Sequence, residues 1–243
     1  MNYGSPPKPQ LMKIDLHCHT EASYDCITPV EILAHRCKAE SITIQAITDH
    51  NEIWGAEKLK ALAERQSEFS LTIIIGEEIS TREGEIIGLF LKEKINAGQT
   101  PEETIDQIKA QGGLVLLPHG FDPLKRYRLK PEARARIAGS FDIIESFNSR
   151  VAFPPFNQAA ALWAKVQGLP TSAGSDAHTG ADVGSAWVEA PFRAIQTPAD
   201  LIAALKEGHP TGEWTQPVLA FLYKAWDYLR HKVRVSLAEK PAK

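Results

Sequence analysis

The sequence predicts an α/β fold built on a parallel sheet, and three observations support this prediction. Short, β-branched apolar runs alternate along the chain with longer helical patterns. Most of these runs are continuous rather than alternating in polarity, which is typical of strands covered on both faces. About seven strand–helix units in roughly 200 residues suit a small, closed barrel. We therefore expect a barrel-like α/β domain.

Seven apolar runs are the candidate strands. In chain order they are Lys13–Leu16, Ile42–Ile47, Leu71–Ile75, Ile86–Leu91, Leu114–Leu117, Asp142–Ser146 and a weaker one at Thr171–Ala173. Helices of about 10–15 residues between them would return each strand parallel to the one before it.

The helices between these strands carry recognisable start signals. An N-cap threonine, a proline at the first helical position and an acid three residues after the cap occur together at Thr28–Glu31, Thr100–Glu103 and Thr197–Asp200. Further helices are expected over Trp54–Glu68, Pro131–Ala138 and Phe156–Gln167, the last of them ended by Gly168.

The composition excludes several classes of protein. With 27 Lys or Arg against 30 Asp or Glu, the net charge is −3, so no extended nucleic-acid interface is expected. No stretch approaches the roughly 20 apolar residues of a membrane span. Three cysteines, Cys18, Cys26 and Cys37, are too few and odd in number for a disulfide framework. This favours a reducing compartment and a cytoplasmic location.

The chain divides into three expected regions. Residues 1–11 contain three prolines and little that can be buried, so we expect a flexible leader without a secretory signal. Residues 12–212 hold the strand–helix pattern of the barrel, and residues 213–243 form a C-terminal amphipathic helix and tail.

The C-terminal helix is predicted over Glu213–Val235. Its apolar residues recur every three or four positions, at Trp214, Val218, Leu222, Trp226, Leu229 and Val233. The favoured interpretation is a helix packed across the barrel. A contact between copies in a homo-oligomer and a helix on a membrane surface are the alternatives.

Histidines and carboxylates gather just after the predicted strands. Asp15-Leu16-His17-Cys18-His19 ends the first strand, and strand alternation places both imidazoles on one face. Similar groups follow other strands, at Asp49-His50, Glu77-Glu78, His119 and Asp176-Ala177-His178. The strand ends of a parallel barrel are where its active site lies. The alternative, a set of polar side chains within the core, would leave several buried carboxylates without partners, which is costly.

The types of side chain indicate a metal centre. Neutral imidazoles and carboxylates suit Zn, Mn or Fe(II) and are poor ligands for Ca or soft copper. The candidate ligands outnumber the three or four that one catalytic ion needs, so two or three divalent ions are expected.

The chain resembles the PHP (polymerase and histidinol phosphatase) family. The resemblance covers residues 13–210 and rests on Asp-Leu-His-Cys-His-Thr at 15–20, Ile-Thr-Asp-His at 47–50, Gly-x-Glu-Ile at 76–79, Pro-His at 118–119 and Ser-Asp-Ala-His at 175–178. It implies a distorted (βα)7 TIM-like barrel with a two- or three-metal site at its C-terminal mouth and hydrolysis of phosphoesters.

The resemblance also assigns ligands to each ion. His17, His19, Glu78 and Asp176 would hold one ion, and Glu78 would bridge to a second held with His119. Asp25, His50 and His178 would surround a third. Alternation alone leaves Glu77 and Glu78 open, and the family pattern selects Glu78.

Two departures from the family pattern concern the second ion. Many members carry another histidine where this chain reads Gly84-Glu85-Ile86-Ile87-Gly88, and a histidine or cysteine within the stretch Glu145–Arg150. The His119 site is therefore short of ligands, with Glu145 or Asn148 as candidates to complete it.

The expected reaction is hydrolysis of a small phosphomonoester or nucleotide through a metal-bridging hydroxide. Asp176, His178 and His119 are the candidate catalytic residues, the two histidines as possible proton donors. Asp15 is expected to orient an imidazole. The candidates for binding the small phosphorylated substrate are basic or polar residues that follow the fifth and sixth strands: Lys125, Arg126, Asn148 and Arg150.

Two other functions remain open at this point. One keeps the metal ions but hydrolyses an amide or lactone. The other is a non-catalytic PHP module that binds a partner, although a purely structural metal site would be closed and need fewer ligands.

Overall fold

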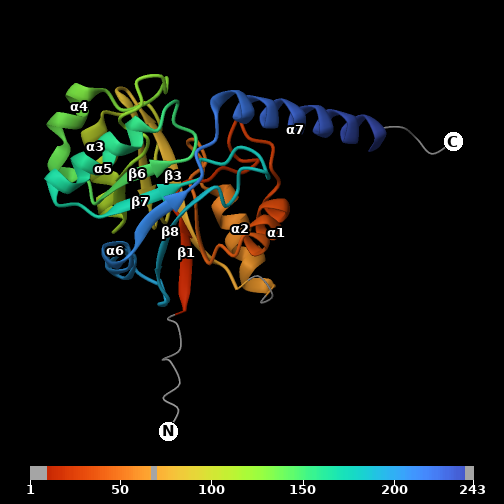
Figure 1. Ribbon diagram of the computed structural model, residues 1–243, viewed down its shortest axis with the longest axis horizontal. Coiled ribbons are helices and arrows are strands. Elements are labelled where there is room, and N and C mark those ends of the chain that lie inside the picture. Colours follow the sequence, from red (N-terminus) through yellow and green to blue (C-terminus); the bar gives the residue numbers. More distant parts are fainter. Residues whose placement is uncertain (1–9, 67–69, 239–243) are drawn as a thin grey trace, which may run out of the picture.

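The computed structural model describes residues 10–66 and 70–238, which form a mixed α/β structure (Figure 1). Its strands are β1 (Leu11–Asp15), β2 (Ile44–Ile47), β3 (Thr72–Thr81), β4 (Gly84–Leu89), β5 (Leu114–Leu117), β6 (Ile143–Asn148), β7 (Thr171–Gly174), β8 (Ala186–Pro191) and β9 (His209–Gly212). The helices are α1 (Val30–Ala39), α2 (Trp54–Arg65), α3 (Pro101–Ala110), α4 (Pro131–Arg136), the 3-10 turn η2 (Ala138–Ser140), α5 (Pro155–Gln167), α6 (Pro198–Glu207) and α7 (Pro217–Ala238).

The sheet curls into a nearly closed barrel. Its strand order is β7-β6-β5-β4-β3-β2-β1-β8-β9. Beyond the paired strands, the ends of β1 and β7 also meet, because Leu16 N–H donates to the Ala173 carbonyl (3.1 Å) and Asp176 N–H donates to the His17 carbonyl (2.8 Å). The predicted barrel-like α/β fold is confirmed, and all seven predicted strands are present.

The sheet is not entirely parallel, and here the expected strand–helix repeat is wrong. β1, β2 and β3 are parallel neighbours, as are β5, β6 and β7, but β4 runs antiparallel to both β3 and β5. β3 continues past its predicted end and turns back directly at Arg82-Glu83, with Gly84 at φ +125°. A hairpin needs only a short turn, whereas a parallel return needs a crossover of a dozen or more residues.

Two further strands, β8 and β9, were not predicted. β8 lies antiparallel to β1, and β9 lies antiparallel to β8. The β9 sequence, His-Pro-Thr-Gly, has no apolar run that would have indicated a strand.

The capping predictions are confirmed at two helices and wrong at one. Thr100 and Thr197 both form capping boxes, with Glu103 and Asp200 respectively. Thr28 does not cap α1: Pro29 is the N-cap and the helix begins at Val30. The Thr28 carbonyl instead accepts the Glu21 N–H (2.9 Å), which keeps Thr28 in the preceding loop.

The other helix limits also agree closely with the sequence pattern. Gly168 ends α5 in the left-handed conformation, with φ +68°. α2 ends at Arg65, and the predicted end of this helix at Glu68 lies outside the described residues. Residues 1–9 of the expected leader lie outside them as well, and β1 begins at Leu11, one residue before the expected start of the barrel.

Helices cover the outside of the barrel. Leu33 of α1 and Leu59 of α2 are fully buried against β2 residues such as Ile47. On another side, Ile108 of α3 and Ala164 of α5 pack against the middle strands. Burying a leucine contributes about 1.5–3 kcal/mol. This apolar shell fixes the strands whose carboxyl ends carry the candidate ligands.

The C-terminal helix α7 does not pack its apolar stripe across the barrel, so the favoured interpretation from sequence is wrong. Val218, Leu222, Trp226 and Leu229 are 53–68% exposed. Trp214 precedes the helix, and its indole N–H donates to the Val151 carbonyl (2.8 Å). Among the described residues, no helix has the length and apolar character needed to cross a membrane.

Candidate metal centre

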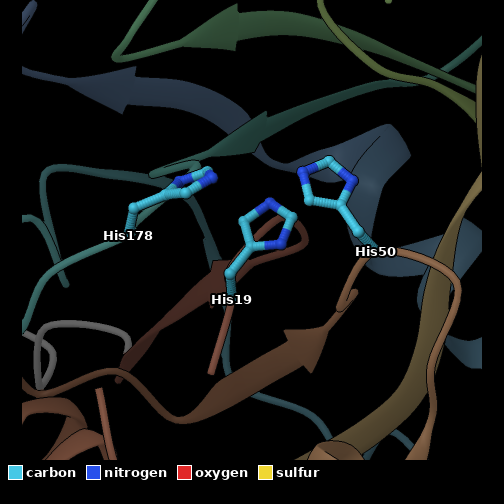
Figure 2. Close-up of side chains that lie close together, drawn as sticks. All are labelled: His19, His50 and His178. Carbon is cyan, nitrogen blue, oxygen red and sulfur yellow. The ribbon is translucent and has the colours of Figure 1, made fainter. Parts of the chain in front are cut away.

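The eight predicted ligands converge at the end of the barrel where the parallel strands finish. Figure 2 shows three of them, His19, His50 and His178, with their rings directed toward one another. Their ligand atoms lie within 4.8 Å of each other, although the residues follow β1, β2 and β7, at widely separated points in the chain.

The most buried ligands surround one point. His17 Nε2 lies 3.2 Å from Glu78 Oε2 and 3.7 Å from Asp176 Oδ1. His19 Nε2 lies 3.4 and 3.5 Å from the same two oxygens, and the two Nε2 atoms are 3.2 Å apart. Two imidazoles and two carboxylates with none more than 2% exposed form the ligand set expected for one divalent cation.

Glu78 also faces a second group of ligands. Its other oxygen, Oε1, lies 3.1 Å from His119 Nε2, and His17, Glu78 and His119 together could hold an ion. A carboxylate that uses its two oxygens in two directions is suited to bridging two ions. Glu77 points elsewhere and accepts the Ile95 N–H (2.8 Å).

The third group lies nearer the surface. Asp25 Oδ2 is 2.9 Å from His178 Nε2, and Asp25 Oδ1 is 3.8 Å from His50 Nε2. The Asp25 side chain is 23% exposed. It also accepts an ion pair from Lys224 of α7 (3.0 Å), a contact between residues 199 positions apart.

Glu85 was not among the predicted ligands. Its Oε1 lies 3.5 Å from His50 Nδ1, and His50, Glu78 and Glu85 form a further group that could hold an ion. Glu85 lies in the stretch where the family histidine is absent. Strand alternation in the sequence could have identified Glu85 as a residue that points inward, because it shares a face of β4 with the buried Ile87 and Leu89.

Glu145 and Asn148 form hydrogen bonds that hold candidate ligands in position. Glu145 Oε1 accepts from His17 Nδ1 (2.9 Å), while its Oε2 accepts the His119 N–H (2.6 Å) and the Asn148 amide (3.0 Å). Both Glu145 oxygens are therefore occupied by donors from the protein. The same Asn148 amide also donates to Asp176 Oδ2 (3.2 Å).

Asp15 does not orient an imidazole ring, contrary to expectation. It accepts the N–H of His17 (3.1 Å), and from Ser175 both the N–H (3.1 Å) and the hydroxyl (2.6 Å). Burial raises the pKa of Asp15 to about 6, although these hydrogen bonds oppose the shift. Asp15 thus joins the ends of β1 and β7, and Glu145 orients the His17 ring.

Two more imidazoles are fixed in the same way, through Nδ1. His19 Nδ1 lies 3.0 Å from the Ser23 hydroxyl, which donates to Asp49 Oδ1 (3.0 Å). His178 Nδ1 donates to the Asp176 carbonyl (2.8 Å). With the Nδ1 proton held by a partner, Nε2 of each ring keeps its lone pair for the site.

Burial and neighbouring charges strongly shift the pKa values of the residues in the site. Burial opposes ionisation of Asp176 and Glu78, yet the pKa of both is well below its usual range. Lys125 and His17 stabilise the Asp176 carboxylate, and His17 and His50 stabilise that of Glu78. Burial lowers the pKa of His50 to about 4, and burial together with Glu78 raises that of Glu85 to about 10.

Unsatisfied atoms and strained backbone are consistent with a cation site. Asp25 Oδ1 and His50 Nδ1 are buried and have no hydrogen-bond partner among the described residues. His119 and Asp176 have positive φ angles of 26° and 50°, a conformation that costs a non-glycine residue about 1 kcal/mol or more. The residues present therefore fit a centre of two or three divalent ions.

The candidate substrate residues occupy different positions around this centre. The Lys125 ammonium contacts Asp176 Oδ2, and Arg150 Nη1 donates to the Asp176 carbonyl (3.1 Å). Asn148 is fully buried. Arg126 is exposed and packs over the Tyr127 ring at 5.2 Å.

Arg126 also lines a pocket of about 190 Å³ beside the metal centre. Three more basic residues line this pocket: Arg82, Arg128 and Lys130. Glu85 is part of the same wall, so the pocket adjoins the ligand group of His50 and Glu78.

Comparison with known families agrees with this geometry. The PHP domain family matches residues 15–144, more than half of the chain, and the PHP-associated family matches residues 154–210. The chain therefore belongs to the PHP family.

Curated relatives come from an archaeon and a bacterium. Two uncharacterised proteins of Methanocaldococcus jannaschii are similar: MJ1587, 44% identical over 46% of this chain and 70% of its own, and MJ0417, 35% identical over 78% and 75%. A shorter match, 40% identical, covers 28% of this chain and 24% of the 5'-3' exoribonuclease of Haemophilus influenzae.

Solved structures show the same fold at low identity. A two-domain Bacteroides vulgatus protein, described as containing a predicted PHP-like metal-dependent phosphoesterase, has a TM-score of 0.68 and 18% identity, with 84% of this chain covering 66% of that longer one. A Chromobacterium violaceum amidohydrolase with bound sulfate and no metal has a TM-score of 0.57 and 19% identity, with 82% of this chain and 97% of that one covered.

Proposed function

We propose that this chain is a metal-dependent phosphoesterase that hydrolyses a small phosphomonoester or nucleotide. The observation that carries the proposal is the convergence of His17 Nε2 and His19 Nε2 on the carboxylates of Glu78 and Asp176. Two basic side chains, Lys125 and Arg150, contact Asp176 beside that point. This combination suits a substrate whose reacting group is an anion.

The ligand groups divide between two or three ions. His17, His19, Glu78 and Asp176 would hold the first ion, and Glu78 and His119 the second. Asp25, His50 and His178 would hold the third. Glu85 is an added ligand beside His50 and Glu78. Imidazole and carboxylate donors suit Zn, Mn or Fe. When bound, such ions supply an acidified water and neutralise phosphate charge.

The chain's own residues would position the phosphate. Lys125 and Arg150 both contact Asp176, so their charges lie at the ligand cluster and would bind phosphate oxygens there. Arg126 would bind a more distant part of an anionic substrate from the adjoining pocket. Asn148, which is fully buried, acts on Asp176 and Glu145 by hydrogen bonding and so serves as a positioning residue.

Three residues are proposed to act in catalysis. Asp176 would hold a metal ion together with His17 and His19 and lies beside Lys125 and Arg150, where the phosphate would bind. His119 and His178 are the candidates to protonate the leaving oxygen in a centre where the ion beside that histidine is not bound, because a ring nitrogen that binds an ion has no proton to donate. Each is 6% exposed, whereas His17 and His19 are buried more deeply. The three cysteines are free and buried, which agrees with the proposed cytoplasmic location.

Hydrolysis of an amide or lactone is the second candidate. It is favoured by the name amidohydrolase given to the Chromobacterium violaceum protein, which nevertheless binds sulfate, an anion shaped like phosphate. The exoribonuclease name of the Haemophilus influenzae relative favours a phosphoester.

The direct test compares bond types in one assay. We expect the Mn-loaded protein to release p-nitrophenol from its phosphate mono- or diester, or phosphate from a nucleotide, and to lose this activity on chelation. Inorganic phosphate should inhibit competitively. Turnover of amides or lactones with no turnover of any phosphoester would contradict the proposal, as would a purified protein that binds less than about one ion per chain.

A further inference from the structure

Helix α7 turns its apolar side away from the protein. The opposite side of the helix, which carries Ala220 and Lys224, faces the barrel: Ala220 is 5% exposed and Lys224 pairs with Asp25. Phe221, Leu222 and Trp226 are 71%, 53% and 61% exposed. In most globular proteins the arrangement is the opposite, with the apolar stripe inward.

The direction in which α7 leaves the barrel is set by contacts before its first turn. Thr215 N–H donates to the Ser149 carbonyl (2.8 Å), and the Trp214 indole donates to the Val151 carbonyl (2.8 Å). From there α7 extends past the rest of the molecule, at the opposite end from the start of β1 (Figure 1). Lys224 holds its first half to the barrel, so the exposed side is presented in a defined orientation.

The exposed apolar arc is broad. At about 100° per residue, Phe221 and Leu219 lie roughly 160° apart around the helix. Val218, Leu222, Trp226 and Leu229 fall between them, and all are 53–68% exposed. A seam for a two-stranded coiled coil is narrower than this arc.

Residues 217–243 carry a net positive charge, whereas the rest of the chain carries a net negative charge. From residue 217 onward the sequence contains six Lys or Arg and two acidic residues, Asp227 and Glu239. The whole chain has 27 basic and 30 acidic side chains, which leaves 21 and 28 for residues 1–216. Positive charge is thus concentrated on the segment that exposes the apolar arc.

We propose that the apolar arc of α7 docks on an anionic lipid surface. Apolar and aromatic side chains on one side of a helix, combined with Lys and Arg on the same segment, are the features of helices that lie in the headgroup region. Burial of the arc would provide the apolar contribution, and basic residues near the surface would add an electrostatic attraction to anionic lipid.

A second copy of the chain fits this surface less well. Two α7 helices packed in parallel through their arcs would bring the basic residues of both segments together, and like charges at such a contact are destabilising. An anionic surface complements the same charges. The proposal is independent of the reaction proposed above, because it concerns only the C-terminal helix.

The test uses the full chain and vesicles of defined composition. Vesicles of phosphatidylcholine alone are compared with an equal mixture of phosphatidylcholine and phosphatidylglycerol, and bound protein is measured by sedimentation. The test variant is Leu222→Ser with Trp226→Ser. The matched control is Leu162→Ser with Val166→Ser on α5, which removes two apolar side chains that are 64% and 73% exposed. Circular dichroism establishes that both variants remain folded.

We expect the wild-type chain and the α5 control to bind the anionic vesicles and to be released by added salt. The α7 variant should show a roughly tenfold or greater decrease in the ratio of bound to free protein. Equal binding to both kinds of vesicle, or unchanged binding of the α7 variant, would overturn the proposal. Failure to bind vesicles would also overturn it, and a dimer in light scattering that the α7 substitutions abolish would assign the arc to a second copy.

Discussion

The candidate metal centre has two parts that are built differently. The inner group, defined as His17, His19, Glu78, His119 and Asp176, is at most 6% exposed. The outer group, defined as Asp25, His50, Glu85 and His178, includes the 23%-exposed Asp25 side chain. Inner ligands stand at strand ends that hydrogen bonds join directly, whereas Asp25 stands in the loop between β1 and α1 and is held partly by α7.

The difference indicates a division of roles. Buried hydrogen bonds from Glu145 and Asn148 fix the inner ligands, and such support keeps ligand atoms in place before any ion arrives. In the outer group, Asp25 depends on a loop and on an ion pair at the surface, which is weaker and more sensitive to salt. We therefore expect substitutions in the inner group to have larger effects than those in the outer group.

The largest effect is expected for Asp176→Asn. The change removes a charged ligand of the inner group, and kcat/KM should fall by about 1000-fold or more, with loss of bound metal. Metal analysis and steady-state kinetics measure both quantities. Asp106→Asn, at an exposed position on α3, is the control and should leave them unchanged. Wild-type activity in Asp176→Asn would mean that the inner group is not the site of the reaction.

Glu145→Gln should have the next largest effect, a loss of metal affinity. The amide can still accept from His17 Nδ1, but its NH₂ would face the His119 N–H and the Asn148 amide, which are donors. Loss of such support typically weakens metal binding about 10- to 100-fold. Competition with a chelating dye measures the affinity, and Glu189→Gln on β8 is the control. An unchanged affinity would show that the inner ligands need no support from Glu145.

The inner group could be predicted from the sequence because its chemistry follows local rules. His17 and His19 are two residues apart on a strand and must share a face. Asp176 and His119 directly follow strands that the apolar pattern also identifies, and parallel strand ends meet at one end of a barrel. The family pattern then selected Glu78 over Glu77, and Glu78 lies close to His17, His19 and His119, the other candidate ligands.

The outer group depends on features that the sequence pattern does not display. Glu85 reaches His50 because β4 reverses direction, and the hairpin was missed when Ile86–Leu91 was interpreted as another parallel strand. The ion pair between Lys224 and Asp25 joins residues 199 positions apart. Periodicity likewise predicts a stripe on α7 without indicating which side of the helix the protein covers.

Glu85→Gln tests whether the outer group includes this carboxylate. The pKa of Glu85 is raised to about 10, so Glu85 is protonated at neutral pH when no ion is bound and must lose its proton to become a ligand. We expect the variant to bind its outer ion about tenfold more weakly and to release about one proton fewer per chain. Proton release is measured with an indicator dye during metal titration.

Glu83→Gln is the matched control for this measurement. Glu83 lines the same pocket as Glu85 but pairs with Arg136 at the surface. It should behave as the wild type does. Equal proton release by the wild type and Glu85→Gln would remove Glu85 from the ligand set and leave Asp25, His50 and His178 alone in the outer group.

Lys224→Met is expected to have a smaller effect on the affinity for the outer ion, and to raise that affinity rather than lower it. The Lys224 ammonium competes with a cation for Asp25 Oδ2, so its removal should tighten binding of the outer ion about two- to fivefold. Calorimetric titration measures the change. Lys58→Met, which removes the ion pair with Glu21 (2.7 Å), is the control. Weaker binding in Lys224→Met would show that the helix helps to form the outer group rather than opposing its occupation.

The smallest effect on activity is expected for Glu77→Gln, which alters a carboxyl group next to Glu78 in sequence but outside both groups. Burial raises the pKa of Glu77 to about 7 from 4.5. The folded state therefore binds this proton more tightly, and its contribution to stability, complete at low pH, is lost as pH rises from about 4.5 to about 7. Glutamine has no such proton to lose. In chelated protein, the free energy of unfolding of Glu77→Gln relative to wild type should be about 2–3 kcal/mol more favourable at pH 8 than at pH 5, measured by urea denaturation. A pH-independent difference would show that folding does not raise the pKa of Glu77. A loss of activity in the metal-loaded variant would place Glu77 within the functional site and remove the distinction between the two neighbouring glutamates.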